Sequence, residues 1–333
     1  MQSPMTSAVI VRFVLALVLV FARGECAHSQ ASSSIWPDRA LRLIVPLPAG
    51  SAADVVARLI GQRLSERLGQ PVLVEDRPGA SGTIGAEAVA RASPDGYTLG
   101  LATSTTHITA PIFNSKLAYD PIRDFAPVAI VALSPYVLVV RPGVPAKNVS
   151  ELIAVAKTKP RQLSYSSVGQ ASQGHLAAEL FATMAGITLN HIPYKSSTHA
   201  VIDLNEGRID MQFGILGTTL ALIRDGKLRA LATTAERRTS ELPDVPSMIE
   251  SGLPGYEATL LFAVVLPAGT PPAIVTRLNR EITGIMAADD VKRALAAQAI
   301  QAVSSTPDAL RERIRQEIDL WRGLAVKAGI RTE

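Results

Sequence analysis

The sequence predicts an α/β fold in which mostly parallel sheets are flanked by helices. Short apolar runs alternate with amphipathic helical patterns along almost the whole chain, which is typical of parallel strands connected by helices. Aromatic residues make up only 5% of the chain, and its aliphatic composition suits tightly packed strands covered by helices. A chain of 333 residues exceeds what one hydrophobic core usually organises, so we expect two domains.

The N-terminal residues 1–29 are predicted to be a cleaved signal peptide and not part of the fold. Arg12 precedes the unbroken apolar run FVLALVLVFA, and small and polar residues follow it. The run is too short for a permanent membrane-spanning helix. Cleavage is expected after Ser29, with Ala31 as an alternative, and an uncleaved anchor is the other interpretation.

The rest of the composition excludes several classes of function. Cys26 is the only cysteine and lies in the leader, where the preceding Glu25 argues against a lipoprotein. The mature chain then has no disulfide, no thiolate nucleophile and no zinc–cysteine site. The formal net charge of +4 is spread along the chain without the basic stripe of a nucleic-acid-binding protein. No later segment approaches the length of a membrane span, so we expect a soluble mature protein.

Motifs of common enzymes and cofactor sites are also missing from the sequence. There is no G-x-S-x-G elbow and no H-E-x-x-H zinc motif. The segment GASGTIG, residues 79–85, has the spacing G-x-x-G-x-x-G, which fits neither a dinucleotide loop nor a phosphate-binding P-loop. It is more typical of a tight turn into a helix over residues 83–91. We therefore expect no cofactor and no metal.

The individual elements follow from the apolar pattern. A helix over residues 51–68 places Val56, Ile60 and Leu64 on one stripe, and a helix over residues 149–157 begins with a capping box. Strands are predicted over residues 41–47, 72–75, 97–102, 127–133, 136–141, 163–166, 189–193, 209–213, 228–233 and 258–266.

The C-terminal part is predicted to be helical, without new strands, and to pack back on an existing sheet. Helices are expected over residues 271–287 and 289–297. Pro307 opens a longer helix that Gly329 ends. Its buried face is predicted to consist of Leu310, Ile314, Ile318 and Trp321.

Two long apolar stretches, residues 125–140 and 256–266, are predicted to cross between two lobes. Lobe one then comprises residues 34–130 and 256–333, and lobe two comprises residues 131–255. Two connecting strands of this kind form a hinge with a cleft between the lobes.

The loops that follow the predicted strands are rich in small hydroxyl residues. They read PAGSAAD, TSTTH, SSVGQASQGH, YKSSTH and GILGTT. In parallel sheets, ligands bind at the carboxyl ends of strands, and helix N-termini there hold carboxylates through free N–H groups. The alternative is that these residues are only helix caps and turn formers. His107 and His175 are candidates for acid–base chemistry or, in the other interpretation, for hydrogen bonding.

In several segments, taken in order, the chain resembles substrate-binding proteins of the tripartite tricarboxylate transporter system, the Bug receptor family. The segments include IVPLPAGSAADVVARL, GQPVLVEDRPGASGTIGAEAVARASPDGYTL, YDPIRDFAPVAIV, HIPYKSS and PAGTPPAIVTRLN. The resemblance extends from about Pro37 to Ile330. It implies a periplasmic, two-lobed binding protein of the Venus flytrap type, type II-like, which captures a small organic acid and presents it to a membrane permease.

The resemblance also implies where the carboxylate is held: backbone N–H groups, hydroxyls and water in one loop of each lobe. Carried over to this chain, the wall on lobe one consists of Pro48, Ala49, Gly50, Ser51, Ala52, Thr103, Ser104, Thr105, Thr106 and His107. The opposite wall consists of Ser166, Ser167, Gly169, Gln170, Ser172, Tyr194 and Lys195, with Gly214 and Ile215 beside it.

Two departures from the family pattern bear on the ligand. The first loop usually reads P-P-G-G, whereas here it reads Pro48-Ala49-Gly50-Ser51, which still offers N–H groups and adds a hydroxyl. Where the family often has F-D-N, this chain has Phe213-Gly214-Ile215, so an aspartate that could face a ligand ammonium is missing. We therefore expect a plain carboxylic acid and not an amino acid, with an apolar part near Ile215.

The favoured function is a monomeric transport receptor without catalysis. Its partners are a small organic acid and a permease of the tripartite tricarboxylate type. A periplasmic sensor that reports the same ligand to a signalling partner is an alternative that the sequence does not separate from transport. A secreted hydrolase or isomerase that depends on His107 is a third.

Overall fold

The computed structural model describes residues 36–194 and 197–330. The described residues from Arg39 onward form one compact unit. The predicted signal peptide, residues 1–29, lies outside the described residues, as does Lys195. The boundaries of the two predicted lobes remain a prediction.

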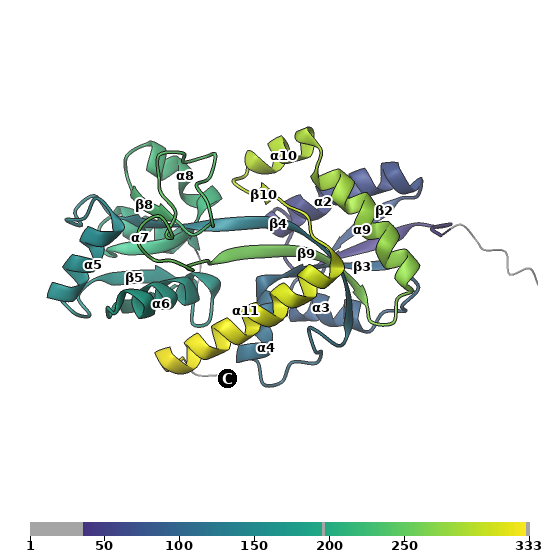
Figure 1. Ribbon diagram of the computed structural model, residues 1–333, viewed down its shortest axis with the longest axis horizontal. Coiled ribbons are helices and arrows are strands. Elements are labelled where there is room, and N and C mark those ends of the chain that lie inside the picture. The colour runs from purple at the N-terminus through teal and green to yellow at the C-terminus, as the bar shows by residue number, and fades with distance from the viewer. Residues whose placement is uncertain (1–35, 195–196, 331–333) are drawn as a thin grey trace, which may run out of the picture. The chain divides into compact units, whose positions relative to one another are not determined.

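The fold is an α/β fold, as predicted, built on a sheet that has ten strands in the described part of the chain (Figure 1). Every predicted strand segment overlaps an observed strand. The strands are β1 (Leu41–Val45), β2 (Val72–Asp76), β3 (Thr98–Thr103), β4 (Phe125–Val140), β5 (Ser164–Ser167), β6 (Asn190–Pro193), β7 (Met211–Ile215), β8 (Arg229–Thr233), β9 (Thr259–Pro267) and β10 (Gln301–Ala302).

Helices follow most of the strands and cover the sheet. They are α2 (Ala52–Leu68), η1 (Ala80–Gly82), α3 (Thr83–Ala90), η2 (Thr105–Thr109), α4 (Ala110–Phe113), α5 (Val149–Thr158), α6 (Gln173–Ala185), α7 (Ser197–Asn205), α8 (Leu216–Arg224), α9 (Pro272–Met286), α10 (Asp289–Ala296) and α11 (Pro307–Ala328). The glycine-rich segment after β2 is a turn into α3, as predicted.

The sheet contains two parallel groups joined by antiparallel strands. β1 pairs in parallel with β2 and β3, and β5 pairs in parallel with β6 and β7. Between the groups, β4 and β9 pair antiparallel with each other, and β9 also pairs antiparallel with β3. The sheet as a whole is therefore mixed, because the strands that join the two groups run against their neighbours.

β4 is a single 16-residue strand that links the two groups. Its first part, through Pro135, pairs with β9, and the part from Tyr136 onward pairs with β7 and β8. Two separate strands were predicted here, over residues 127–133 and 136–141, whereas the apolar stretch predicted to connect the lobes, residues 125–140, has the bounds of β4. Where the partner strand changes, the Tyr136 N–H donates to Thr234 Oγ1 over 2.8 Å, and the Tyr136 carbonyl accepts from the Thr234 N–H over 2.9 Å. Figure 1 shows β4 and β9 running side by side between the groups.

Helix α2 begins and ends where its sequence predicts. Ser51 is its N-cap and accepts a hydrogen bond from the Asp54 N–H, while Gly69 ends it with a φ of +69°. Val56, Ile60 and Leu64 are fully buried against the sheet. The apolar stripe read from the sequence is therefore the packed face of the helix.

The C-terminal part differs from the prediction in one respect. α11 buries Leu310, Ile314, Ile318 and Trp321 as expected, and it packs along β4 and α6. The tail was predicted to add no strand, which is wrong, because β10 pairs antiparallel with Leu133 and Ala132 of β4. A two-residue strand has too short a pattern to be read from sequence.

Candidate functional site

The loop between β1 and α2 is organised around a buried carboxylate. The Gly50 N–H donates to Asp54 Oδ2 over 2.8 Å, and Arg58 Nε lies 2.6 Å from Asp54 Oδ1. Burial disfavours ionisation of Asp54, but the Gly50 amide and Arg58 outweigh burial and hold its pKa below the usual range. Gly50 adopts a φ of +78°, which favours glycine. The protein's own carboxylate thus occupies one of the amides predicted to hold the ligand.

Two further amides of this loop lack a hydrogen-bond partner. Ala52 and Ala53 form the first turn of α2, and the structure gives their N–H groups no partner among the described residues. Ala52 is half-buried and Ala53 is fully buried, so only Ala52 has surface that a ligand reaches in this conformation. Such groups carry the positive end of the helix dipole and bind anions. Pro48, Ala49 and Gly50 are exposed beside them. The donors at this end of β1 are therefore at the start of the helix and not at Gly50.

Most hydroxyls of the loop after β3 are engaged within the protein. The Thr106 N–H donates to Thr103 Oγ1 over 3.2 Å, and the Thr103 N–H donates to Thr106 Oγ1 over 3.1 Å. Ser104 Oγ accepts from the Leu261 N–H of β9 over 2.8 Å. Thr105, the remaining hydroxyl residue of the predicted set, is half-buried. These bonds fix the π-helical turn η2 against β9, so three of the four predicted hydroxyls hold the loop in place.

His107 lies in an aromatic cluster of the core. Its side chain is 1% exposed, its ring centroid is 4.5 Å from that of Phe125, and its Nδ1 is 2.9 Å from Thr106 Oγ1. Burial lowers the pKa of His107 from 6.5 to about 3. The ring is therefore neutral near pH 7 and supplies no positive charge to an anion.

The loop after β5 is closed by its own serines. Ser167 Oγ donates to the Gly169 carbonyl over 2.9 Å and lies 2.7 Å from His191 Nε2. Ser172 caps α6 and donates to the same carbonyl over 2.8 Å. Gln170 is exposed at the tip of the loop. The predicted residues of this loop therefore lie close together, and the hydrogen bonds of Ser167 and Ser172 fix the conformation of the loop.

Two stacked histidines support this loop, and one of them, His191, was not predicted. The rings of His175 and His191 lie 4.1 Å apart and are inclined by 7°, and Tyr165 stacks on His191 at 4.9 Å. His175 Nδ1 accepts the N–H of Ala171 over 3.1 Å. Its pKa is lowered to about 4, first by burial and then by His191. The loop therefore depends on a neutral imidazole.

We expect acid to destabilise the protein through His175. The unfolded chain binds this proton near pH 6.5, so the contribution of His175 to the free energy of unfolding is present above pH 6.5 and is lost as the pH falls towards 4. Glu179 Oε1, 3.9 Å from His175 Nε2, offsets only part of the cost of the charge. Between pH 7 and pH 5, wild type should lose about 1–2 kcal/mol more than His175→Asn, which keeps an acceptor and does not titrate.

Urea unfolding of the two proteins at both pH values checks this expectation. Groups that titrate in the same range without contact to His175 cancel in the comparison, and the double variant His175→Asn/His191→Asn against His191→Asn removes the effect of the stacked His191. Equal losses in wild type and His175→Asn would show that the imidazole is not held neutral.

The remaining predicted residues lie at the ends of β6 and β7. The Tyr194 hydroxyl donates to Asp203 Oδ2 over 2.6 Å, and burial together with Asp203 raises the pKa of Tyr194 to about 12. A Cβ added at Gly214 would lie 2.6 Å from Thr219 Cγ2 and 3.4 Å from Gln212 Oε1. The Thr219 methyl group and the Gln212 amide therefore occupy the space that an aspartate side chain at position 214 would need. Ile215 follows, half-buried, as the N-cap of α8.

In the parallel group β5, β6 and β7, two neighbouring side chains each have a polar oxygen without a hydrogen bond. Ser166 of β5 and Gln212 of β7 are paired in register, and they are 0% and 4% exposed. Ser166 Oγ and Gln212 Oε1 have no partner among the described residues. An unmade hydrogen bond of this kind costs about 1–3 kcal/mol. Gln212 was missed, although an amide between Met211 and Phe213 in an apolar strand was a readable signal.

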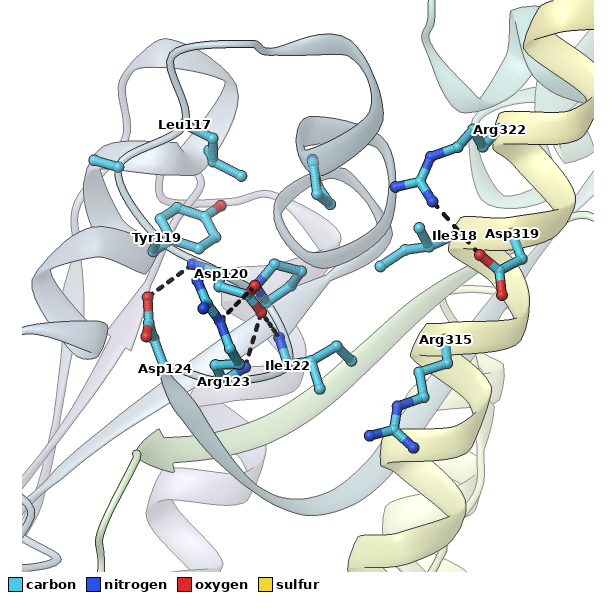
Figure 2. Close-up of a pocket in the computed structure, with 13 residues that line it drawn as sticks. Leu117, Tyr119, Asp120, Ile122, Arg123, Asp124, Arg315, Ile318, Asp319 and Arg322 are labelled. Carbon is cyan, nitrogen blue, oxygen red and sulfur yellow. Dashed lines mark hydrogen bonds and ion pairs between the residues drawn. The ribbon is translucent and has the colours of Figure 1, made fainter.

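None of the predicted ligand residues in the described part of the chain lines the cavity beside α11 or the one beside β4 and β9. One of about 570 Å³ lies between the segment Leu117–Asp124 and α11 (Figure 2). Its arginines and aspartates balance, with Arg123 paired to Asp120 at 2.9 Å and Arg322 to Asp319 at 3.5 Å. This cavity is therefore not the predicted carboxylate site. Another, of about 510 Å³, lies beside Leu133 and Pro135 of β4 and Thr259 of β9.

Neither a metal centre nor a membrane span is found in the described part of the chain. No group of three or more His, Cys, Asp or Glu side chains there has the arrangement that would hold a metal ion. None of the helices in that part combines the length and apolar character needed to cross a membrane.

Comparison with known proteins gives consistent results over most of the chain. The family model described as "Tripartite tricarboxylate transporter family receptor" matches residues 56–330. BugT of Bordetella pertussis is 37% identical over 317 residues, which cover 95% of this chain and 97% of BugT.

Two solved structures are similar in sequence and in fold. Rpa4515 of R. palustris, solved with adipate, is 37% identical with a TM-score of 0.75, over 89% of this chain and 99% of that one. MatC (Rpa3494) of Rhodopseudomonas palustris, solved with bound malate, is 31% identical with a TM-score of 0.70, over 87% of this chain and 99% of that one.

Proposed function

Because the chain belongs to the tripartite tricarboxylate transporter receptor family, we propose that it is a periplasmic receptor that captures a small organic carboxylate and delivers it to a tripartite permease. The similar proteins solved with adipate and malate support a carboxylate ligand. The ligand lies between two lobes, formed by residues 34–130 with 256–333 and by residues 131–255. β4 is one of the connections between them, and its pairing changes at Pro135 and Tyr136.

The observation that carries the proposal is the free N-terminus of α2. The N–H groups of Ala52 and Ala53 lack partners, and they follow a loop held in shape by Asp54. The free amides and the dipole of a helix N-terminus bind a carboxylate without an arginine, and Ala52 is the half-buried residue of this pair. On the other lobe, Ser167 and Ser172 hold the loop after β5 in one shape through the Gly169 carbonyl. Closure of the lobes would exclude water and strengthen every hydrogen bond to the ligand.

The ligand is a carboxylic acid without an ammonium group. Near Gly214 the protein presents the Gln212 amide and the Thr219 methyl in the space that a side chain would use. An amide carries no charge, so it does not offset the desolvation of an ammonium group. Ile215 lies beside this position and offers apolar contact.

A thermal-shift panel tests the proposal. Adipate, malate and other small di- and tricarboxylic acids should include at least one that raises the melting temperature by about 3 °C or more, because a ligand of the folded state stabilises it. Aspartate and glutamate should leave the melting temperature unchanged. A shift with aspartate or glutamate and with none of the acids that lack an amine would contradict the proposed ligand class.

A further inference from the structure

We propose that His175 and His191 are positioning residues of the receptor, which hold the loop between β5 and α6 in the shape that binds the carboxylate. The loop consists of residues 168–172 and includes Gln170, an exposed member of the proposed ligand wall. Neither histidine is itself assigned to the ligand. The inference rests on the proposed function, and it deepens it by naming what prepares one wall of the site.

The loop has a backbone conformation that its own residues do not favour. Ala171 has a φ of +59°, in the left-handed region, and Gly169 has a φ of +120°. An alanine stays in this region only where neighbouring groups hold it there. Ser167 and Ser172 both donate to the Gly169 carbonyl, but neither of these hydrogen bonds involves Ala171. The support for Ala171 therefore comes from outside these serines.

His175 supplies this support through one hydrogen bond. Its Nδ1 accepts the Ala171 N–H over 3.1 Å. Its backbone lies in the first turn of α6, where the His175 N–H donates to Ser172 Oγ. Burial lowers the pKa of His175 to about 4, so Nδ1 carries no proton near pH 7 and can accept. This bond ties the left-handed residue of the loop to a regular helix.

His191 supports the same loop from β6. Its Nε2 lies 2.7 Å from Ser167 Oγ, whose own proton goes to the Gly169 carbonyl. We therefore assign the proton of His191 to Nε2, which donates to Ser167. The pairing of His191 with Tyr165 of β5 fixes the strand that carries the ring. The loop is thus held at one end by His191 and at the other by His175, whose rings stack at 4.1 Å.

The two histidines act on the ligand through the loop and not through charge. Burial lowers the pKa of both, so both imidazoles are neutral near pH 7. Glu179 Oε1, 3.9 Å from His175 Nε2, accepts the Tyr165 hydroxyl over 2.6 Å. His175 is only 5% exposed, so its ring is not a surface that a ligand contacts.

Two substitutions of His175 test the proposal by isothermal titration calorimetry with the best carboxylate of the panel. His175→Leu has no acceptor for the Ala171 N–H and should bind about fivefold more weakly than wild type, as expected for one lost neutral hydrogen bond. His175→Asn places an amide oxygen near the position of Nδ1 and should lose at most about twofold. Wild-type affinity in His175→Leu, or equal losses in the two variants, would overturn the proposal.

A glycine at position 171 gives a readout that a merely structural role of His175 would not change. Glycine adopts a positive φ without outside support. His175→Leu/Ala171→Gly should therefore recover affinity to within about twofold of wild type. An affinity as low as that of His175→Leu alone would show that His175 does not act through the conformation of Ala171.

His191→Gln and His191→Leu form a second pair, at a half-buried position that tolerates substitution better. The glutamine keeps a donor near the position of Nε2, whereas the leucine has none. His191→Leu should weaken binding about fivefold and His191→Gln at most about twofold. Equal affinities in the two variants would remove His191 from the positioning role.

Amide exchange of Ala171, followed by NMR without any ligand, separates this inference from the proposed function. The Ala171 amide should exchange at least about fivefold faster in His175→Leu than in wild type or His175→Asn. Equal rates in the three proteins would overturn the inference, whatever the protein binds. The expected rates together with no binding of any carboxylate would instead contradict the proposed function, and with it the role of the loop in carboxylate binding.

Discussion

Replacement of Arg313 by alanine should lower the free energy of unfolding by about 3 kcal/mol at pH 8, because it leaves a carboxylate buried without its partner. Arg313 pairs with Glu317, which is 6% exposed, and with Glu257 Oε1 at 2.7 Å. The Trp321 Nε1–H also donates to Glu317, over 3.3 Å. Arg313 thus connects α11 to the residues just before β9.

The loss should be smaller in acid. Burial raises the pKa of Glu317 although Arg313 opposes it, and without Arg313 the pKa should rise further. A carboxyl group with a raised pKa in the folded state destabilises the fold as the pH rises through that pKa, so Arg313→Ala should be closer to wild type at pH 5 than at pH 8. Urea unfolding followed by circular dichroism at both pH values measures the difference.

Arg315→Ala is the matched control for this prediction. Arg315 is exposed on the same helix, two residues further along, and its loss should change the free energy of unfolding by no more than about 0.5 kcal/mol. Similar losses in both variants, or a loss in Arg313→Ala that does not depend on pH, would show that Glu317 is not the group left unpaired.

Gly50→Val should reduce the affinity for the best carboxylate of the panel at least about tenfold, because it displaces the loop that precedes the free N-terminus of α2. Gly50 has a φ of +78°, and its N–H is bound by Asp54. A β-branched residue does not adopt this conformation without strain, so the loop must rearrange. Isothermal titration calorimetry measures the affinity directly.

Gly69→Val provides the control at the other end of the same helix. Gly69 has a φ of +69°, and at both glycines an added Cβ would meet no atom within 4 Å. The two variants should therefore lose similar stability through backbone strain, while only Gly50→Val loses affinity. Equal affinities in the two variants would remove the β1–α2 loop from the site.

The secondary structure was predictable because its signals are local. Ser51, Asn148 and Thr306 are caps with a side-chain bond to the third residue of their helices, and each stands before an apolar stripe. The apolar stretch of residues 125–140, predicted as a connecting strand, has the bounds of β4. β10 was not predictable, since it has only two residues and depends on a partner strand far away in the sequence.

The candidate site was predictable only in its position. A serine or threonine after a strand can bind a ligand or fasten its own loop, and the sequence is the same in both cases. In the loop after β3, Thr103, Ser104 and Thr106 serve the loop itself. Asp54 was not among the predicted site residues, yet its side chain reaches back to the Gly50 N–H. Only the folded chain shows which donors remain.

Hydrogen–deuterium exchange with and without the best carboxylate of the panel tests the central claim most directly. The account predicts slower exchange at Ala52 and Ala53, at the start of α2, and also in the loop after β5, because the carboxylate binds between these segments of the two lobes. Unchanged exchange at the start of α2 in the presence of saturating ligand would contradict the account, since its free amides would then not be the donors.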